Sequence, residues 1–214
     1  MSAVKMVLGE QHLSVADDRL QHAGKWFASD LQFHKQFPAS VHEQASMHWT
    51  PLHIARKAAE FLAVEKNTSI LDIGSSVGKF CLAAAYYQPQ SFFYGVEQRE
   101  ELVTWANIAK QNTGLKNVSF LHENLTQLDL SQYDHFYFFN AFYENIDDSY
   151  KIDNSITYSH SLYNSYNRFL YKQLEKKDPG TRLATFHSME DEIPPAYHEV
   201  GSAADDLLKF WIKI

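Results

Sequence analysis

The stretch that decides the fold reads Ile70-Leu71-Asp72-Ile73-Gly74-Ser75-Ser76-Val77-Gly78-Lys79. An apolar strand over 69–73 carries Asp72 near its end, and a loop bounded by Gly74 and Gly78 opens directly into a helix over 79–87. Glycine lets a backbone turn sharply and approach a ligand closely. The first turn of a helix leaves N–H groups free for an anionic or polar group. The stretch therefore predicts a strand, loop and helix that bind a ligand.

Strands and helices alternate on both sides of this unit. The patterns predict helices over 51–62, 99–112 and 162–174, and strands over 91–96, 118–121, 135–139, 182–186, 197–200 and 207–214. This alternation is typical of a parallel sheet covered by helices, and the last two strands, with no helix between them, are expected to be antiparallel. We predict an α/β fold: a Rossmann-like, seven-stranded, mostly parallel sheet with helices on both faces and the last strand antiparallel.

The first 45 residues have a different composition from the rest. They are polar, and their scattered apolar residues are compatible with one or two short helices that Pro38 interrupts; these residues are Leu13, Leu20, Trp26, Phe27, Leu31 and Phe33. We expect residues 1–45 to form a helical extension or lid, and residues 46–214 to form the main domain.

Composition narrows the class of protein. The 214 residues carry a formal net charge of −7, so we expect the chain to repel a phosphate backbone and to have no nucleic-acid partner. The one cysteine, Cys81, excludes an internal disulfide and a CxxC motif. Residues 1–13 lack a signal pattern, and the longest apolar stretch, 80–87, is far shorter than the roughly 20 residues that span a bilayer. A cytoplasmic protein without membrane contact is expected, and its oligomeric state is left open.

An acidic residue ends the second strand. Glu97 follows Gly78 by 19 residues, the spacing at which a carboxylate accepts hydrogen bonds from a ribose diol. The nicotinamide fingerprint G-x-G-x-x-G is missing, which argues against a nucleotide-dependent oxidoreductase. The three histidines that lie closest together, His42, His48 and His53, lack the spacing of a metal site, and we expect no metal.

The loop resembles motif I of the class I S-adenosylmethionine-dependent methyltransferases, an acid-x-Gly-x-Gly-x-Gly pattern. Asp72, Gly74 and Gly78 match it, and Ser76 stands where the family has its middle glycine. The loop is also similar to that of the non-SET-domain histone lysine methyltransferases. Residues 95–97, Gly-Val-Glu, resemble the family's ribose-binding motif, and 118–125 resemble its third-strand segment, in which Asn124 stands where an Asp is frequent. The resemblance covers about residues 50–214.

This resemblance implies S-adenosylmethionine as the cofactor. The residues expected to bind it are Trp49, Thr50, Asp72, Gly74, Ser75, Ser76, Gly78, Glu97, Gln98, Asn124, Leu125 and Asn140. We expect Asn124 to reach the adenine through its side-chain carbonyl, and Trp49 and Thr50 to cover the methionine end.

The residues after the fourth strand are candidates for the acceptor site. Residues 140–143, Asn-Ala-Phe-Tyr, faintly resemble the Asn-Pro-Pro-aromatic motif of methyltransferases that act on planar nitrogens, without its prolines. We expect Phe142, Tyr143 and Tyr150 to bind substrate, and Asn140 and Tyr143 to serve catalysis.

The sequence thus predicts a methyltransferase that acts on a nitrogen or oxygen of a protein or small-molecule acceptor. The alternative is a non-catalytic subunit that binds S-adenosylmethionine with a degenerate methyltransferase fold, which Ser76 and the missing prolines favour.

Overall fold

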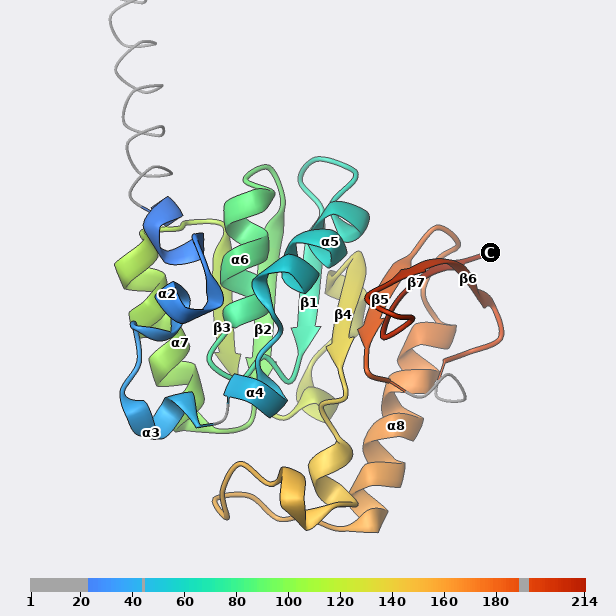
Figure 1. Ribbon diagram of the computed structural model, residues 1–214. Helices are drawn as coiled ribbons and strands as arrows, with labels where there is room; N and C mark the ends of the chain where they lie inside the picture. The colour runs from blue at the N-terminus through green and yellow to red at the C-terminus, as the bar shows by residue number, and fades with distance from the viewer. Residues whose placement is uncertain (1–22, 44, 189–192) are drawn as a thin grey trace, which may run out of the picture.

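Seven strands form one sheet, in the order β3-β2-β1-β4-β5-β7-β6 (Figure 1). The structure is a computed structural model and describes residues 23–43, 45–188 and 193–214. The strands are β1 (Ser69–Ile73), β2 (Phe92–Glu97), β3 (Val118–His122), β4 (His135–Phe139), β5 (Arg182–Phe186), β6 (Tyr197–Ala203) and β7 (Leu208–Lys213). Strands β1 to β5 run parallel, and β7 pairs antiparallel with both β5 and β6. The predicted fold class is confirmed.

The strand order reverses at β1, which pairs with β2 on one side and with β4 on the other. Because the first five strands are parallel, their carboxyl ends meet at one edge, the lower edge of the sheet in Figure 1. Ligands of open α/β sheets bind at this edge, where the order reverses. The loops after β1, β2 and β4 therefore surround one point.

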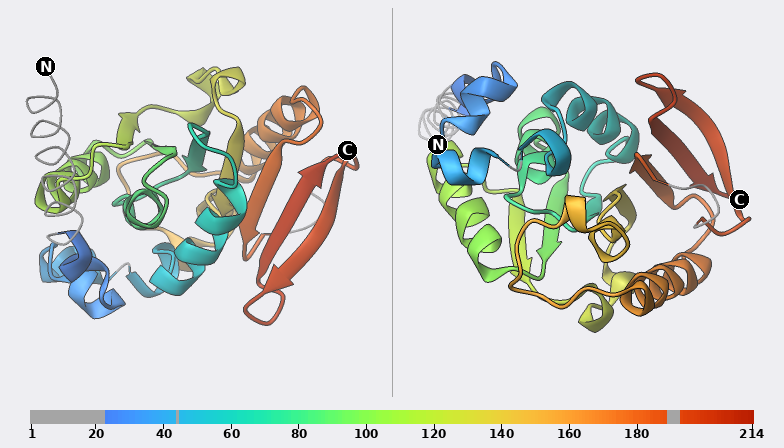
Figure 2. Two further views of the ribbon diagram at one scale, coloured as in Figure 1. Left: turned by 90° about the horizontal axis from the view of Figure 1, so that it is seen from above. Right: turned by 60° about the horizontal axis from the view of Figure 1, so that its bottom comes forward.

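Helices cover both faces of the sheet. One apolar cluster contains buried residues of the helices α5 (Leu52–Leu62), α6 (Lys79–Tyr87) and α7 (Glu100–Thr113). A second cluster contains buried residues of α8 (His160–Glu175). Successive strand residues point to opposite faces, so Ile70 joins the first cluster and its neighbour Leu71 joins the second. In the left view of Figure 2, α5 and α8 lie on opposite sides of the sheet.

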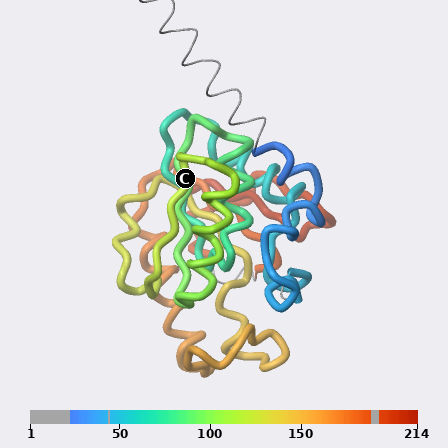
Figure 3. Tube along the Cα trace, turned by 90° about the vertical axis from the view of Figure 1, so that its left-hand side faces the viewer, coloured from blue at the N-terminus to red at the C-terminus, as the bar shows by residue number. Residues whose placement is uncertain are grey.

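The described part of the N-terminal segment is built into the main core. It consists of η1 (Lys25–Phe27), α2 (Asp30–His34), α3 (Ala39–His42) and α4 (Ala45–His48). Phe27, Phe33 and Phe37 are buried in the same cluster as α5 and α6, and Phe27 stacks on Tyr86 with ring centroids 4.7 Å apart. Figure 3 shows this blue segment along one side of the molecule. Pro38 separates α2 from α3 as predicted; Leu13 and Leu20 lie outside the described residues.

Strand β6 and the connections after β3 and β4 differ from the sequence-based expectations. Strand β6 continues to Ala203 across an irregularity between Glu199 and Gly201, which an uninterrupted alternation pattern does not reveal. The polar connection after β4 contains two short 3-10 turns, η4 (Tyr143–Asn145) and η5 (Asp148–Tyr150), and two more, η2 (Leu125–Gln127) and η3 (Leu130–Gln132), follow β3. In the described part of the chain, no helix has the length and apolar character that crossing a bilayer requires.

Candidate active site

The loop between β1 and α6 has an unusual backbone. Gly74, Ser76 and Gly78 all adopt left-handed conformations, with φ of +75°, +50° and +76°. A Cβ atom on Gly74 would lie 2.4 Å from the Cβ of Ala141, so the loop packs directly against the segment that follows β4. Two separate parts of the chain are thereby joined at the carboxyl edge of the sheet.

The carboxylate of Glu97 is buried beneath this loop. Its Oε2 accepts a hydrogen bond from the Ser76 backbone N–H at 3.2 Å, and its Oε1 accepts one from the Arg99 backbone N–H at 3.0 Å. Gly95 lacks a side chain for a clear reason, because a Cβ there would lie 2.5 Å from the Oγ of Ser75. The end of β2 and the loop therefore hold the Glu97 carboxylate in a defined orientation.

Arg99 connects this carboxylate to the segment after β4. Its Nη1 donates to Glu97 Oε1 at 3.3 Å, and its Nη2 donates to Glu144 Oε2 at 2.5 Å and to the Tyr158 hydroxyl at 2.7 Å. Its Nε donates to Asp153 Oδ1 at 3.4 Å. Burial opposes the charge of Arg99, but the carboxylates of Glu144 and Glu97 raise its pKa above the ordinary value. Burial raises the pKa of Glu144, and Arg99 opposes that shift.

These elements enclose a cavity of about 260 Å³ at the carboxyl edge of the sheet. Its walls combine carboxylates, amides and aromatic rings from several separate parts of the chain. At its rim the rings of Tyr143 and Tyr150 meet edge to face, with centroids 4.9 Å apart. Phe142 lines the cavity and is buried, because its ring packs on Tyr166 and Phe138. The cavity thus has aromatic rings in its wall beside hydrogen-bonding groups.

A small polar hollow of about 10 Å³ lies beside the cavity and shares Ser76 and Gly74 with it. Three buried polar atoms in its lining have no hydrogen-bond partner among the described residues: Trp49 Nε1, Ser75 Oγ and Ser76 Oγ. Asp72 also lines the hollow, and burial raises its pKa to about 8, while a hydrogen bond from the Cys81 thiol opposes the shift. Unpartnered donors and a buried carboxyl suit a ligand that carries its own carboxylate and ammonium.

Most of the predicted site residues meet at this edge. The cavity is lined by Gly74, Ser76, Glu97, Gln98, Leu125, Asn140, Phe142, Tyr143 and Tyr150. The hollow is lined by Trp49, Thr50, Asp72 and Ser75, together with Gly74 and Ser76.

Gly78 and Asn124 line neither space, which differs from the expectation. A Cβ on Gly78 would lie 2.3 Å from the Phe120 ring, so this glycine serves the packing of α6 on β3. The side-chain carbonyl of Asn124 accepts from Thr126 N at 3.0 Å and caps η2. Its amide donates to Gln98 Oε1 and the Tyr166 hydroxyl, each at 2.9 Å. The carbonyl intended for adenine is therefore already engaged in the turn.

Several residues that line the cavity are not among the site residues predicted from the sequence. Arg99 follows Glu97 by two residues. A charged residue so close to a candidate ribose-binding carboxylate was the signal that could have identified it. Tyr166 and His48 also line the cavity, and neither is among the predicted site residues. Burial, followed by the charge of Arg99, lowers the pKa of His48 to about 4, so its imidazole is neutral at pH 7. No group of three His, Cys, Asp or Glu residues suited to a metal occurs in the described ranges.

Comparisons with known proteins agree with this geometry. A family model described as a methyltransferase domain matches residues 64–189. The chain belongs to this family of S-adenosylmethionine-dependent methyltransferases. The solved structures of an RNA methyltransferase from Salinibacter ruber and of a methyltransferase from Aquifex aeolicus match 77% and 81% of the chain and 92% and 98% of their own, with TM-scores of 0.54 and 0.53. At 20% and 15% identity, they show the methyltransferase fold alone.

Two curated methyltransferases share short segments with the chain. A 23S rRNA (uracil(1939)-C(5))-methyltransferase from Haemophilus ducreyi is 38% identical over 80 residues, which is 37% of this chain and 18% of that protein. A tRNA (guanine-N(7)-)-methyltransferase from Synechococcus is 49% identical over 55 residues, which is 26% of this chain and 23% of that protein. The chain thus matches about a fifth of the length of each relative.

These relatives contradict the prediction that excluded nucleic acid, because their names specify rRNA and tRNA. That prediction rested on the net charge of −7. Net charge sums the whole surface, whereas a phosphate backbone responds to the charges within about 8 to 10 Å of it. The exclusion was therefore wrong for a physical reason.

Proposed function

We propose that this protein transfers a methyl group from S-adenosylmethionine to a nitrogen of a nucleobase in RNA. The observation that carries the proposal is the cavity at the carboxyl edge, which combines the buried Glu97 carboxylate with the aromatic rings of Tyr143 and Tyr150. The RNA-methylating relatives support RNA as the acceptor class. Bound S-adenosylmethionine supplies an electrophilic methyl carbon, so the protein has to align the acceptor atom with it.

The proposed cofactor residues divide into two groups. Glu97, held by the Ser76 and Arg99 N–H groups, would accept hydrogen bonds from the ribose hydroxyls. Asp72 and the unpartnered atoms of Trp49, Ser75 and Ser76 would hold the ammonium and carboxylate of the methionine end. The support for this division is that the hollow and the cavity share the glycine loop.

The proposed acceptor residues line the same cavity. Asn140 is held in a left-handed conformation with φ of +42°, and its backbone carbonyl accepts a hydrogen bond from the Tyr143 backbone N–H at 3.1 Å. Asn140 would orient a planar base through its side-chain amide, and Tyr143 and Tyr150 would pack against the ring. A ring nitrogen that carries no hydrogen presents an in-plane lone pair, so methyl transfer to such an atom requires positioning rather than proton removal.

The test is a labelling experiment with methyl-labelled S-adenosylmethionine and three separate acceptor pools: purified cellular RNA, protein and small molecules. We expect label in RNA that ribonuclease releases, and loss of this label with Glu97→Ala. Glu101→Ala, an exposed carboxylate on α7, is the matched control and should label RNA normally. Label that enters only protein or small molecules would contradict the RNA proposal. Binding of the cofactor without labelling of any pool would contradict the catalytic one.

A further inference from the structure

Helix α8 differs in charge from the acidic chain around it. Residues 154–174 contain no Asp or Glu, and the only acid in α8 is Glu175 at its last position. The first turn of a helix favours acidic side chains, yet the first turn of α8 has none. The part of α8 that begins at the cavity rim is therefore without negative charge.

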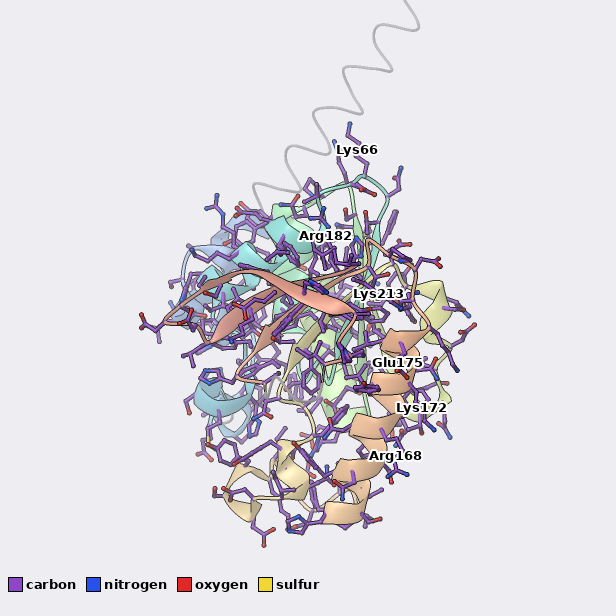
Figure 4. The ribbon with its side chains drawn as sticks, turned by 90° about the vertical axis from the view of Figure 1, so that its right-hand side faces the viewer. Lys66, Arg168, Lys172, Glu175, Arg182 and Lys213 are labelled. Atoms are coloured by element: carbon purple, nitrogen blue, oxygen red, sulfur yellow. The ribbon has the colours of Figure 1, made fainter. Side chains whose placement is uncertain are left out.

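One row of side chains follows the exposed face of α8. At every fourth position stands a residue that is exposed and either cationic or polar: His160, Asn164, Arg168, Lys172 and Lys176. Residues four apart on a helix are neighbours, so these side chains form one continuous ridge about 24 Å long. Figure 4 shows Arg168 and Lys172 projecting outward from α8. Below, this row is called the α8 ridge.

The cations of the α8 ridge have no acidic partner at ion-pair distance among the residues that the structure describes. In residues 23–43, 45–188 and 193–214, Arg168, Lys172 and Lys176 form no ion pair within 4.0 Å. By contrast, Lys213 and Lys177 nearby are committed to backbone carbonyls, such as Glu175 O at 2.5 Å and Tyr133 O at 2.7 Å. The ridge cations thus remain available to an anion from outside.

The opposite face of α8 forms part of the cavity wall. Tyr166 lines the cavity, and Asn145, which also lines it, accepts a hydrogen bond from the Ser159 N–H at 3.3 Å where α8 begins. One end of the α8 ridge therefore lies at the rim of the cavity, and the ridge leads away from it along the surface. A polyanion lying on the ridge would be directed toward the proposed acceptor site.

We infer that the α8 ridge binds the phosphate backbone of the RNA whose base enters the cavity. The inference rests on the proposed function for the identity of the polyanion. Arg and Lys side chains supply the sequence-independent contacts that fix the register of a nucleic acid, and exposed Asn and His add hydrogen bonds to phosphate or sugar. The half-exposed Tyr171, three residues after Arg168, offers a ring on which a base can stack.

The experiment compares two double variants that remove the same charge. Arg168→Gln with Lys172→Gln alters the α8 ridge, whereas Lys57→Gln with Lys116→Gln alters exposed lysines on α5 and before β3, away from α8. Binding to unfractionated tRNA and to a short single-stranded RNA is measured at several salt concentrations. We expect the slope of log K against log salt to fall by about 1.5 for the ridge variant, the effect of two lost phosphate contacts, and to stay at the wild-type value for the control.

Two separate readouts distinguish this inference from the proposed function. Equal slopes for the ridge and control variants, or no RNA binding by the wild type, would overturn the ridge. If the wild type labels no RNA but still binds RNA through the ridge, the proposed function would be overturned and the ridge would stand. Circular dichroism of the variants should match the wild type, since both residues of the ridge variant are exposed.

Discussion

Ser76 occupies a conformation that glycine would adopt without strain. Its φ of +50° lies in the left-handed region, where an L-residue other than Gly, Asn or Asp is uncommon. Its hydroxyl is buried and has no hydrogen-bond partner among the described residues, and it lines both the cavity and the hollow. The strain and the unpartnered hydroxyl together support the proposal that this side chain contacts the cofactor.

Two substitutions at Ser76 separate these contributions. Ser76→Gly should raise the free energy of unfolding by about 0.5–1 kcal/mol, because it relieves the left-handed strain. Ser76→Ala keeps the Cβ and the strain, so it should raise stability less than Ser76→Gly does. Both variants lose the hydroxyl, and we expect both to bind S-adenosylmethionine about threefold to tenfold more weakly, the value of one neutral hydrogen bond. Denaturant titration and calorimetry measure the two effects, and unchanged affinity in both variants would remove the hydroxyl from the proposed site.

Asp72 should make stability depend on pH. Its folded-state pKa of about 8 lies above the ordinary value of 3.8, so the folded protein binds a proton more tightly and loses stability as pH rises toward 8. His48, with a folded-state pKa of about 4, has the opposite dependence, but only between pH 4 and 6.5. Between pH 6.5 and 8, we therefore expect the wild type to lose about 2 kcal/mol relative to Asp72→Asn. Denaturant titrations at the two pH values measure this difference, and parallel behaviour would contradict the raised pKa.

At the scale of elements, the end of β2 and the segment after β4 depend on each other through Arg99. The side chain of Arg99 is 4% exposed, and that of Glu144 is 12% exposed. Removing one partner of a buried ion pair leaves the other charge without compensation. The pairing thus holds the 3-10 turns η4 and η5 against the sheet edge.

Arg99→Gln should therefore lower the free energy of unfolding by about 3–5 kcal/mol. Arg56→Gln is the control, because the Arg56–Glu60 pair on α5 is exposed and should contribute at most about 0.5 kcal/mol. Urea titration measures both, and hydrogen exchange should show faster exchange in residues 143–159 for Arg99→Gln alone. Similar losses for the two variants would mean that the Arg99 network does not hold this segment.

The segment after β4 should control turnover rather than cofactor binding. Asn140 and Tyr143 line the cavity and are the proposed acceptor residues, so each should matter for the acceptor. We expect Asn140→Ala and Tyr143→Ala to lower kcat at least tenfold, about 1.4 kcal/mol of transition-state stabilisation. Their affinity for S-adenosylmethionine should stay near that of the wild type. Normal turnover by both variants on methylatable RNA would place the acceptor elsewhere.

At the scale of the whole molecule, the described part of the N-terminal segment packs as part of the main core. Phe33 on α2 is fully buried, and Lys79 at the start of α6 donates to Asp30 on α2 at 2.5 Å. The segment thus contacts the helix that begins at the glycine loop. A lid that merely covered the site would not contribute to the main core.

Phe33→Ala should consequently lower the free energy of unfolding by about 3–5 kcal/mol, as other buried Phe truncations do. Leu31→Ala on the same helix is the control, because Leu31 is 76% exposed and should change stability by less than about 0.5 kcal/mol. Thermal and urea unfolding measure both variants. If Phe33→Ala lowers the free energy of unfolding as little as Leu31→Ala does, the segment does not contribute to the stability of the main core.

The sequence by itself determined the strand, loop and helix of residues 69–87, and the structure has the predicted bounds for both elements. It also determined the alternation of elements and the location of Glu97 at the end of β2. These features follow from local rules, because glycine conformation, helix start signals and apolar periodicity act over a few neighbouring residues. The fold class could be predicted for that reason, whereas the cofactor was implied by the resemblance of the glycine loop and of residues 95–97 to methyltransferase motifs.

The tertiary structure decided which side chains meet. Arg99 reaches Glu144 and Tyr158, which lie 45 and 59 residues further along the chain. Asn124 is engaged by Thr126, Gln98 and Tyr166 instead of facing the cavity. Such outcomes depend on the packing of segments that are distant in sequence, and no pattern within a short window contains that information.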